Sequence, residues 1–309
     1  MSATMQTNEF ATRRERLAAA WTQLPDKSEE SVEAALRTLW FAAAGAPCSM
    51  ARADRLLPSL GEAQLRTLDE LVERRTQGEP LAYIVGLQSF MGLELETTRA
   101  ALIPRVETEI LAKTALERLS QITNEAERPA VLDICTGCGN VALALAHHSP
   151  TAEVFAADLS QDAVTLARAN ATRLGLQSRV TFEVGDLYAP FADAAFERRF
   201  HVVTCNPPYI SSAKVERMPR EISGHEPRMA FDGGSFGFDI VTRAFSGAPR
   251  FLKPGGWFCF ELGAGQGNFL ADRVRRSKLY AVVDEIRDSA GTTRVIAAKL
   301  GDEGGVTTP

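Results

Sequence analysis

Residues 130–140 read AVLDICTGCGN, an apolar run followed at once by a turn that contains two glycines. The run 130–134 predicts a buried strand, and the apolar spacing of 141–148 predicts a helix directly after the turn. Glycines at the carboxyl end of a parallel strand let a ligand approach the backbone closely, and the first turn of a helix offers free N–H groups. The stretch therefore predicts the first strand–turn–helix unit of an α/β domain with a ligand site at its strand ends.

The same alternation continues to the end of the chain. Further strands are predicted at 153–157, 180–184, 201–205 and 257–261, helices at 161–174, 238–251 and 266–276, and a final antiparallel strand pair at 280–286 and 293–298. Strands that alternate with helices form a mainly parallel sheet covered on both faces. We therefore expect a doubly wound, Rossmann-like α/β fold with seven strands.

The chain before this domain has a different pattern. A length of 309 residues favours two domains over one. Apolar stripes at helical spacing predict an all-α domain over 1–80, with Ser28 or Ser31 as a helix cap, and short strands with glycine turns, 83–86 among them, predict a β-hairpin linker over 81–104. The α/β domain is then expected at 105–300, and 301–309 as a disordered tail.

Composition narrows the class of protein. There are 34 Lys and Arg against 39 Asp and Glu, a formal net charge of −5, which disfavours a protein that coats nucleic acid. No apolar run approaches the ~20 residues of a membrane-spanning helix, and the charged N-terminus does not resemble a secretory signal. An odd number of cysteines, five, fits reduced thiols. We expect a cytoplasmic protein without a membrane anchor.

Two carboxylates extend the predicted ligand site. Asp158 ends the second strand, where it can accept hydrogen bonds from both hydroxyls of a ribose, and Asp186 follows the third, where it can meet an adenine amino group. Together they describe an adenosine-containing ligand. Gly137, Gly139 and Ala142 also fit the loose dinucleotide pattern, so both a dinucleotide and S-adenosylmethionine are compatible with the loop.

Cys135 and Cys138 form a C-x-x-C pair in the same loop. A zinc site needs two further ligands, and the sequence contains no second pair of this kind. A redox pair is conceivable, because a helix N-terminus lowers the pKa of a thiol. We expect no metal, and interpret both residues as small side chains that line the loop.

The most informative stretch for function is 202–210, VVTCNPPYI. Pro207 and Pro208 have no N–H and a fixed φ, so the turn after the fourth strand is stiff and its carbonyls have no local donor. A planar –NH2 group can donate one hydrogen to the side-chain oxygen of Asn206 and the other to the carbonyl of Pro207, with Tyr209 packed on its plane. Beside an adenosyl ligand, this arrangement indicates N-methylation.

The glycine-containing turn, Asp158 and residues 206–209 resemble the class I S-adenosylmethionine-dependent amino methyltransferases. Further segments are similar to those of the protein-glutamine N5-methyltransferases of the HemK/PrmC type. These segments are 78–86 (GEPLAYIVG), 90–93 (FMGL), 102–109 (LIPRVETE), 225–227 (HEP), 230–234 (AFDGG), 252–256 (LKPGG), 261–263 (ELG) and Gln266. The resemblance spans residues 78–298. The N-terminal segment resembles the family only in being helical.

The resemblance implies a substrate, a partner and a set of site residues. That family methylates the side-chain amide of the glutamine in the Gly-Gly-Gln motif of peptide chain release factors. The implied cofactor is S-adenosylmethionine, the implied partner is the release factor, met by the helical domain, and nucleic acid is not expected as a partner. We expect a monomer. The implied cofactor residues are Cys135, Thr136, Gly137, Cys138 and Gly139 for the methionine part, Asp158 for the ribose, Asp186 and Leu187 for the adenine, and Asn206 beside the reacting atoms; the implied substrate residues are Asn206, Pro207, Pro208 and Tyr209, with Asn206, Pro207 and Tyr209 catalytic.

Four residues depart from the family pattern. Val106 stands where a second proline is usual, Cys135 replaces a glycine, Cys138 replaces Ser or Thr, and Asn140 replaces a small or apolar residue. The alternative is therefore an amino methyltransferase of the same fold that acts on nucleic acid or on a small-molecule amide or amine. A cofactor-binding module without activity would not need Asn206 and Tyr209, and a nicotinamide oxidoreductase would leave residues 206–209 unexplained.

Overall fold

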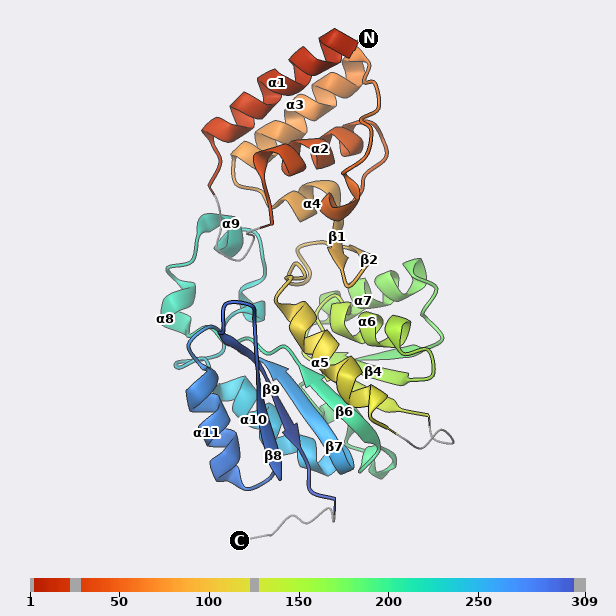
Figure 1. Ribbon diagram of the computed structural model, residues 1–309, viewed down its shortest axis with the longest axis vertical. Helices are drawn as coiled ribbons and strands as arrows, with labels where there is room; N and C mark the ends of the chain where they lie inside the picture. Colours follow the sequence, from red (N-terminus) through yellow and green to blue (C-terminus); the bar gives the residue numbers. More distant parts are fainter. Residues whose placement is uncertain (1–2, 23–28, 123–127, 303–309) are drawn as a thin grey trace. The chain divides into compact units, whose positions relative to one another are not determined.

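The computed structural model describes residues 3–22, 29–122 and 128–302. The chain divides into two compact units (Figure 1). The first comprises Met1–Arg99, Ile103–Arg105 and Pro219–Glu226, and the second comprises Ala100–Leu102, Val106–Met218 and Pro227–Pro309. Of the predicted tail, 303–309 lie outside the described residues. No helix in the described ranges is both long and apolar enough to cross a membrane.

The first unit is mainly helical. It contains α1 (Ala3–Ala19), α2 (Val32–Ala43), α3 (Glu62–Thr76), α4 (Leu81–Val85) and α9 (Arg220–Ser223), with a short 3-10 turn at Met50–Arg52. Ser31 caps α2, as the sequence predicted, because its hydroxyl accepts a hydrogen bond from the N–H of Ala34 at 3.2 Å. The other predicted cap, Ser28, lies outside the described residues. Trp40 is fully buried in the core between the helices, and its indole N–H donates to the carbonyl of Pro58.

The predicted hairpin is present but shorter than expected. Strands β1 (Leu87–Phe90) and β2 (Leu93–Glu96) pair in antiparallel register. The prediction of a strand at 83–86 is wrong, because Leu81–Val85 form the helix α4. Gly86 ends it at φ 77°, a left-handed conformation in which its N–H reaches the carbonyl of Ala82. A five-residue apolar run does not distinguish a strand from one buried helical turn.

The second unit is built on a seven-stranded sheet in the order β5-β4-β3-β6-β7-β9-β8. The strands are β3 (Ala130–Ile134), β4 (Glu153–Asp158), β5 (Val180–Val184), β6 (Phe200–Cys205), β7 (Leu252–Glu261), β8 (Val282–Arg287) and β9 (Thr293–Lys299). Strands β3 to β7 pair in parallel, and β9 is antiparallel to both β7 and β8, so it is the one strand of the described sheet that runs the opposite way. The doubly wound, mainly parallel α/β fold predicted from the sequence is confirmed.

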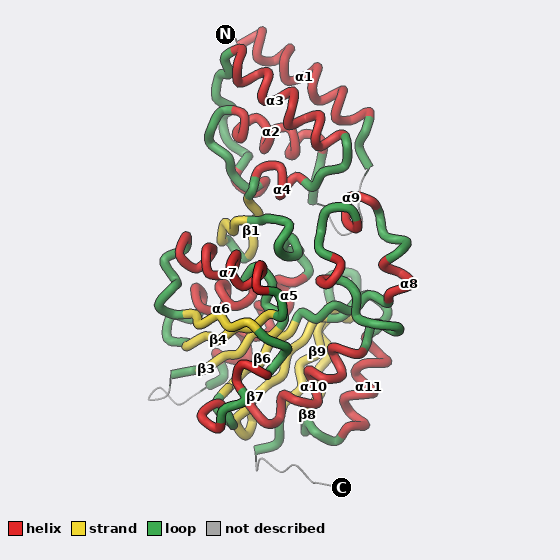
Figure 2. The backbone as a smooth tube through the Cα atoms, turned by 180° about the vertical axis from the view of Figure 1, so that it is seen from behind, coloured by secondary structure: helices red, strands yellow, loops and turns green. Residues whose placement is uncertain are grey.

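Helices cover both faces of this sheet. The longer ones are α5 (Thr108–Ser120), α6 (Asn140–His148), α7 (Gln161–Arg173), α10 (Asp239–Phe251) and α11 (Gly267–Ser277); α8 (Ser212–Val215) is a single turn. Figures 1 and 2, which view the molecule from opposite sides, show α5, α6 and α7 on one face and α10 and α11 on the other. The sheet contributes alternate residues such as Leu132, Ile134 and Phe258 to the core beneath α10 and α11. The sheet thus brings the carboxyl ends of β3, β4, β5 and β6 to one edge.

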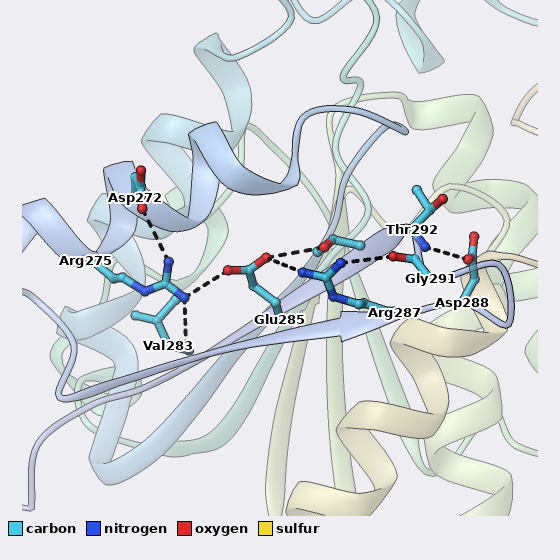
Figure 3. Close-up of polar contacts among 9 residues, drawn as sticks. Asp272, Arg275, Val283, Glu285, Arg287, Asp288, Gly291 and Thr292 are labelled. Carbon is cyan, nitrogen blue, oxygen red and sulfur yellow. Dashed lines mark hydrogen bonds and ion pairs between the residues drawn. The ribbon is translucent and has the colours of Figure 1, made fainter.

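Charged side chains line the edge strand β8 (Figure 3). Glu285 lies between Arg275 of α11, which donates to it at 2.9 Å, and the hydroxyl of Thr293 on β9. Arg287 donates to the carbonyl of Gly291, and Asp288 accepts a hydrogen bond from the N–H of Thr292 in the β8–β9 turn. Charges on an edge strand oppose pairing with strands of other molecules.

Candidate functional site

The loop after β3 is built from left-handed residues. Cys135, Gly137 and Gly139 have φ angles of 58°, 56° and 84°. Gly139 cannot be replaced without movement, because a Cβ there would lie 3.1–3.2 Å from side-chain atoms of Ala167, Leu143 and Phe182. The loop therefore turns directly into α6, and the free N–H groups of that helix face the carboxyl edge of the sheet.

Asp158 ties this loop to the end of β4. Its Oδ2 accepts a hydrogen bond from the N–H of Gly137 at 2.8 Å, and its Oδ1 accepts one from the N–H of Ser160 at 2.9 Å. Burial raises the pKa of Asp158, and the backbone hydrogen bonds oppose that shift. Each carboxylate oxygen has a second lone pair, so the group can still accept two hydroxyl donors from a ligand.

Asp133 holds the loop through a buried hydrogen bond, and it was not among the site residues predicted from the sequence. It is buried, and its two oxygens accept hydrogen bonds at 2.6 Å from the hydroxyls of Thr136 in the loop and Thr204 on β6. Burial raises its pKa to about 6, against the effect of these hydrogen bonds. The available signal was one carboxylate inside the otherwise apolar run 130–134.

The two cysteines of the loop differ in burial and in their neighbours. Cys138 is buried with its thiol near Asn140, and burial raises its pKa to about 12, so it is a protonated thiol at neutral pH. Cys135 is half-buried and lies beside Cys205, whose pKa burial also raises. Within the described ranges, no three His, Cys, Asp or Glu side chains gather as metal ligands would.

The residues predicted to meet an adenine follow β5. Asp186 is about half exposed and forms an ion pair with Arg243 of α10 at 2.5 Å. Leu187 is buried and left-handed, at φ 51°. Both lie at the same edge of the sheet as the loop after β3, because β5 and β3 flank β4 in parallel.

The stiff loop 206–209 follows β6, the other neighbour of β3. Ile134 pairs with Cys205, so Asn206 and Cys135 leave adjacent strands at the same level. The Nδ2 of Asn206 donates to the hydroxyl of Thr108, the first residue of α5, at 3.3 Å. This contact occupies the amide nitrogen and leaves the Asn206 Oδ1 as the free acceptor of the side chain.

Tyr209 is held at both its ring and its backbone. Its phenol donates to Glu261 Oε1 at 3.2 Å, and its carbonyl accepts from Gln266 Nε2 at 2.9 Å. Two glycines leave no space beside it, because a Cβ would lie 2.4 Å from the Tyr209 carbonyl oxygen at Gly237 and 3.0 Å from the ring at Gly263. The structure thus brings every predicted site residue to the carboxyl ends of the strands and fixes the loop 206–209 from several elements.

The side chains that hold this loop were not among the site residues predicted from the sequence. Thr108 and Gln266 appeared there only within segments of family resemblance, and so did Glu261. The one direct signal was Glu261, a carboxylate at the end of the apolar strand 257–261. Their contacts with 206–209 join segments far apart in sequence, which a local pattern does not reveal.

Comparison with known proteins identifies the family. Residues 110–254 match the family model described as the methyltransferase small domain, and residues 15–86 match the PrmC N-terminal domain. The release factor glutamine methyltransferase of Moorella thermoacetica is 38% identical over 263 residues, which cover 84% of this chain and 89% of the relative. The chain belongs to the release factor glutamine methyltransferase family. The protein named release factor glutamine methyltransferase in Bradyrhizobium diazoefficiens is 35% identical over 87% of this chain and 89% of its own length.

Solved structures confirm the fold of this family member at low sequence identity. The hMettl16 catalytic domain, in complex with a MAT2A 3′UTR hairpin, superimposes with a TM-score of 0.53 at 15% identity, covering 78% of this chain and 84% of that one. The human methyltransferase 10 domain containing protein gives a TM-score of 0.51 at 15% identity, covering 79% and 99%. The fold agrees with the family, and the family shows that the chain is a methyltransferase enzyme.

Proposed function

We propose that this protein transfers the methyl group of S-adenosylmethionine to the side-chain amide nitrogen of the glutamine in the Gly-Gly-Gln motif of peptide chain release factors. The observation that carries the proposal is the acceptor loop 206–209, whose orientation Thr108, Glu261 and Gln266 fix beside the glycine loop. The names of the curated relatives support the substrate.

The glycine loop fits an adenosyl cofactor. Its left-handed backbone at Cys135, Gly137 and Gly139 turns the chain into α6, whose first-turn N–H groups lie at the carboxyl ends of the strands, and Asp158 keeps lone pairs for two ribose hydroxyls. In this assignment the segment 135–139 holds the methionine part, and Asp186 with Leu187 holds the adenine. When bound, the cofactor supplies a methyl group already activated by its positive sulfur.

The acceptor loop supplies alignment. The free Oδ1 of Asn206 and the carbonyl of Pro207 accept the two hydrogens of the glutamine amide, and the ring of Tyr209 packs against its plane. An amide nitrogen is a poor nucleophile because its lone pair is delocalised. Holding both hydrogens favours localisation of that lone pair towards the methyl group, and a near-attack geometry at about 3 Å supplies much of the acceleration. After the transfer the nitrogen releases one of its two protons to solvent water, which restores a neutral amide.

The partner follows from the same assignment. We assign the helical domain 1–80 and the linker 81–104 to contact with the release factor, and the domain 105–300 to catalysis. A release factor substrate places the reaction in the cytoplasm, and we expect the enzyme to act as a monomer without direct contact with nucleic acid. The alternative of a nucleic-acid or small-molecule substrate is not favoured, because the curated relatives quoted above are named for release factors.

The test is transfer of radiolabelled methyl from S-adenosylmethionine to a purified release factor. The control is the same release factor with the glutamine of its Gly-Gly-Gln motif changed to alanine. We expect label on the first and none on the second. Equal labelling of both would show that another residue is the target. No label on either, with cofactor binding confirmed by calorimetry, would refute the assignment of the release factor as substrate.

A further inference from the structure

Glu261 is a buried carboxylate directly behind the acceptor loop. It ends strand β7 and is only 4% exposed. Its Oε1 accepts the hydrogen bond of the Tyr209 phenol at 3.2 Å, whereas its Oε2 has no hydrogen-bond partner among the described residues. Burying a carboxylate with one oxygen unpaired is costly, so this position is poorly suited to a purely structural role.

Groups from three other segments face this carboxylate. Burial raises the pKa of Glu261 to about 7, while hydrogen bonds from Thr108 at the start of α5 and from Tyr209 lower it. The negative charge of Glu107, also on the segment that starts α5, raises the pKa further, and the positive charge of Arg294 on β9 lowers it. Glu261 therefore contacts the acceptor loop directly through the phenol of Tyr209.

The direction of the hydrogen bond between Tyr209 and Glu261 follows from the chemistry of the two groups. A phenol has one hydrogen to donate, and a carboxylate oxygen accepts it, so Tyr209 donates to Glu261 Oε1 at 3.2 Å. Without an acceptor at position 261, the phenol of Tyr209 loses this contact and the loop loses one of the groups that hold it.

We propose that Glu261 is a positioning residue that orients the acceptor loop by accepting the hydrogen bond of the Tyr209 phenol. The inference rests on the proposed function, because that function gives Tyr209 its role. Glu261 does not touch the substrate in this scheme. Its contribution is a hydrogen-bond acceptor, so an amide at the same position preserves it, whereas an apolar side chain of similar size removes it.

The first experiment compares Glu261→Leu with Glu261→Gln in the release factor methylation assay. We expect Glu261→Leu to lower kcat by about tenfold to a hundredfold, as expected for lost alignment, with the Kd for S-adenosylmethionine within about twofold of the parent. We expect Glu261→Gln to keep kcat within about fivefold, because its amide oxygen still accepts. The control is Glu153→Leu, which removes an exposed glutamate, ion-paired with Arg199, from the first residue of β4, at the amino end of that strand.

The second experiment measures coupling. In a Tyr209→Phe background, Glu261→Leu should cause a much smaller further loss of kcat than it does alone, because the shared contact is already gone. A structural defect would instead lower kcat by the same factor in both backgrounds. Wild-type kcat in Glu261→Leu, additive losses, or a Glu261→Gln variant as inactive as Glu261→Leu would each overturn the inference.

Failure of the proposed function gives a different result. If the wild-type enzyme does not label the release factor, the substrate assignment is wrong. The coupling can then be measured as the shift in the urea midpoint of unfolding, without turnover. Non-additive shifts for Glu261→Leu and Tyr209→Phe would support the contact, and additive shifts would overturn the inference without reference to the substrate.

Discussion

Replacing Gly139 by alanine tests the packing of the cofactor loop. Two costs apply at this position. A left-handed φ of 84° costs an alanine about 1–2 kcal/mol relative to glycine. Its Cβ would also lie 3.1–3.2 Å from Ala167, Leu143 and Phe182, tighter than normal contact, and overpacking of this kind costs about 1–3 kcal/mol. We expect Gly139→Ala to lower the free energy of unfolding by about 2–5 kcal/mol.

Gly175→Ala is the matched control. Gly175 is also left-handed, at φ 70°, but within the described part of the chain no atom lies within 4 Å of the Cβ it would gain. It should therefore carry the conformational cost of about 1–2 kcal/mol alone. Any effect of the substitution on the unfolded chain is shared by both variants and cancels in the comparison.

The assay is urea unfolding of the two variants beside the parent, with midpoints compared at a common m-value. A calorimetric titration with S-adenosylmethionine should show weaker binding for Gly139→Ala only, because relief of the contacts moves the loop. Equal destabilisation of the two variants would refute the packing argument. Normal cofactor affinity in a destabilised Gly139→Ala would refute the assignment of this loop to the cofactor.

Three further predictions concern individual site residues. Asp158→Ala should weaken S-adenosylmethionine binding by at least about tenfold in calorimetry, because two hydrogen bonds to the ribose contribute over about 1 kcal/mol. Unchanged affinity would show that Asp158 does not bind the ribose. Asn206→Ala should remove most methyl transfer in the radiolabel assay and leave cofactor affinity nearly intact, and surviving turnover would contradict the amide clamp. Glu261 has a pKa of about 7 against an ordinary value of 4.5, so the folded state loses stability as pH rises between these values. Glu261→Gln lacks this loss, and its stability relative to the parent should increase from pH 4.5 to pH 7 by up to about 3 kcal/mol in urea unfolding; a difference that does not change with pH would contradict the raised pKa.

The sheet was predictable because its strands are nearly continuous apolar runs. The run 130–134 coincides with β3, and 180–184 coincides with β5. The predicted strand 257–261 proved to be the second half of β7, which begins at Leu252. Lys253, Pro254 and two glycines interrupt the apolar pattern in its first half, so the local signal for a strand was absent there.

The main residues of the candidate site were visible for a similar reason. Asp158 and Asn206 each follow a recognisable strand, and the ends of parallel strands meet at one edge, so local pattern and fold together place them. The supporting residues could not be found in this way. Thr108 lies 98 positions before Asn206, and Asp133 lies 71 positions before Thr204. Their importance comes from contacts that exist only once the sheet has formed.

The position of β9 has a consequence for biosynthesis. Strand β7, which ends in Glu261, pairs on one side with β9, and β9 spans Thr293–Lys299. While the ribosome is still adding those residues, β7 is an edge strand with unpaired backbone groups, although β3 to β6 have already been made. The acceptor loop, which relies on Glu261, therefore reaches its final form after most of its own domain has been translated. The apolar second half of β7, residues 257–261, is therefore an exposed strand edge during this interval, and such edges are prone to aggregation.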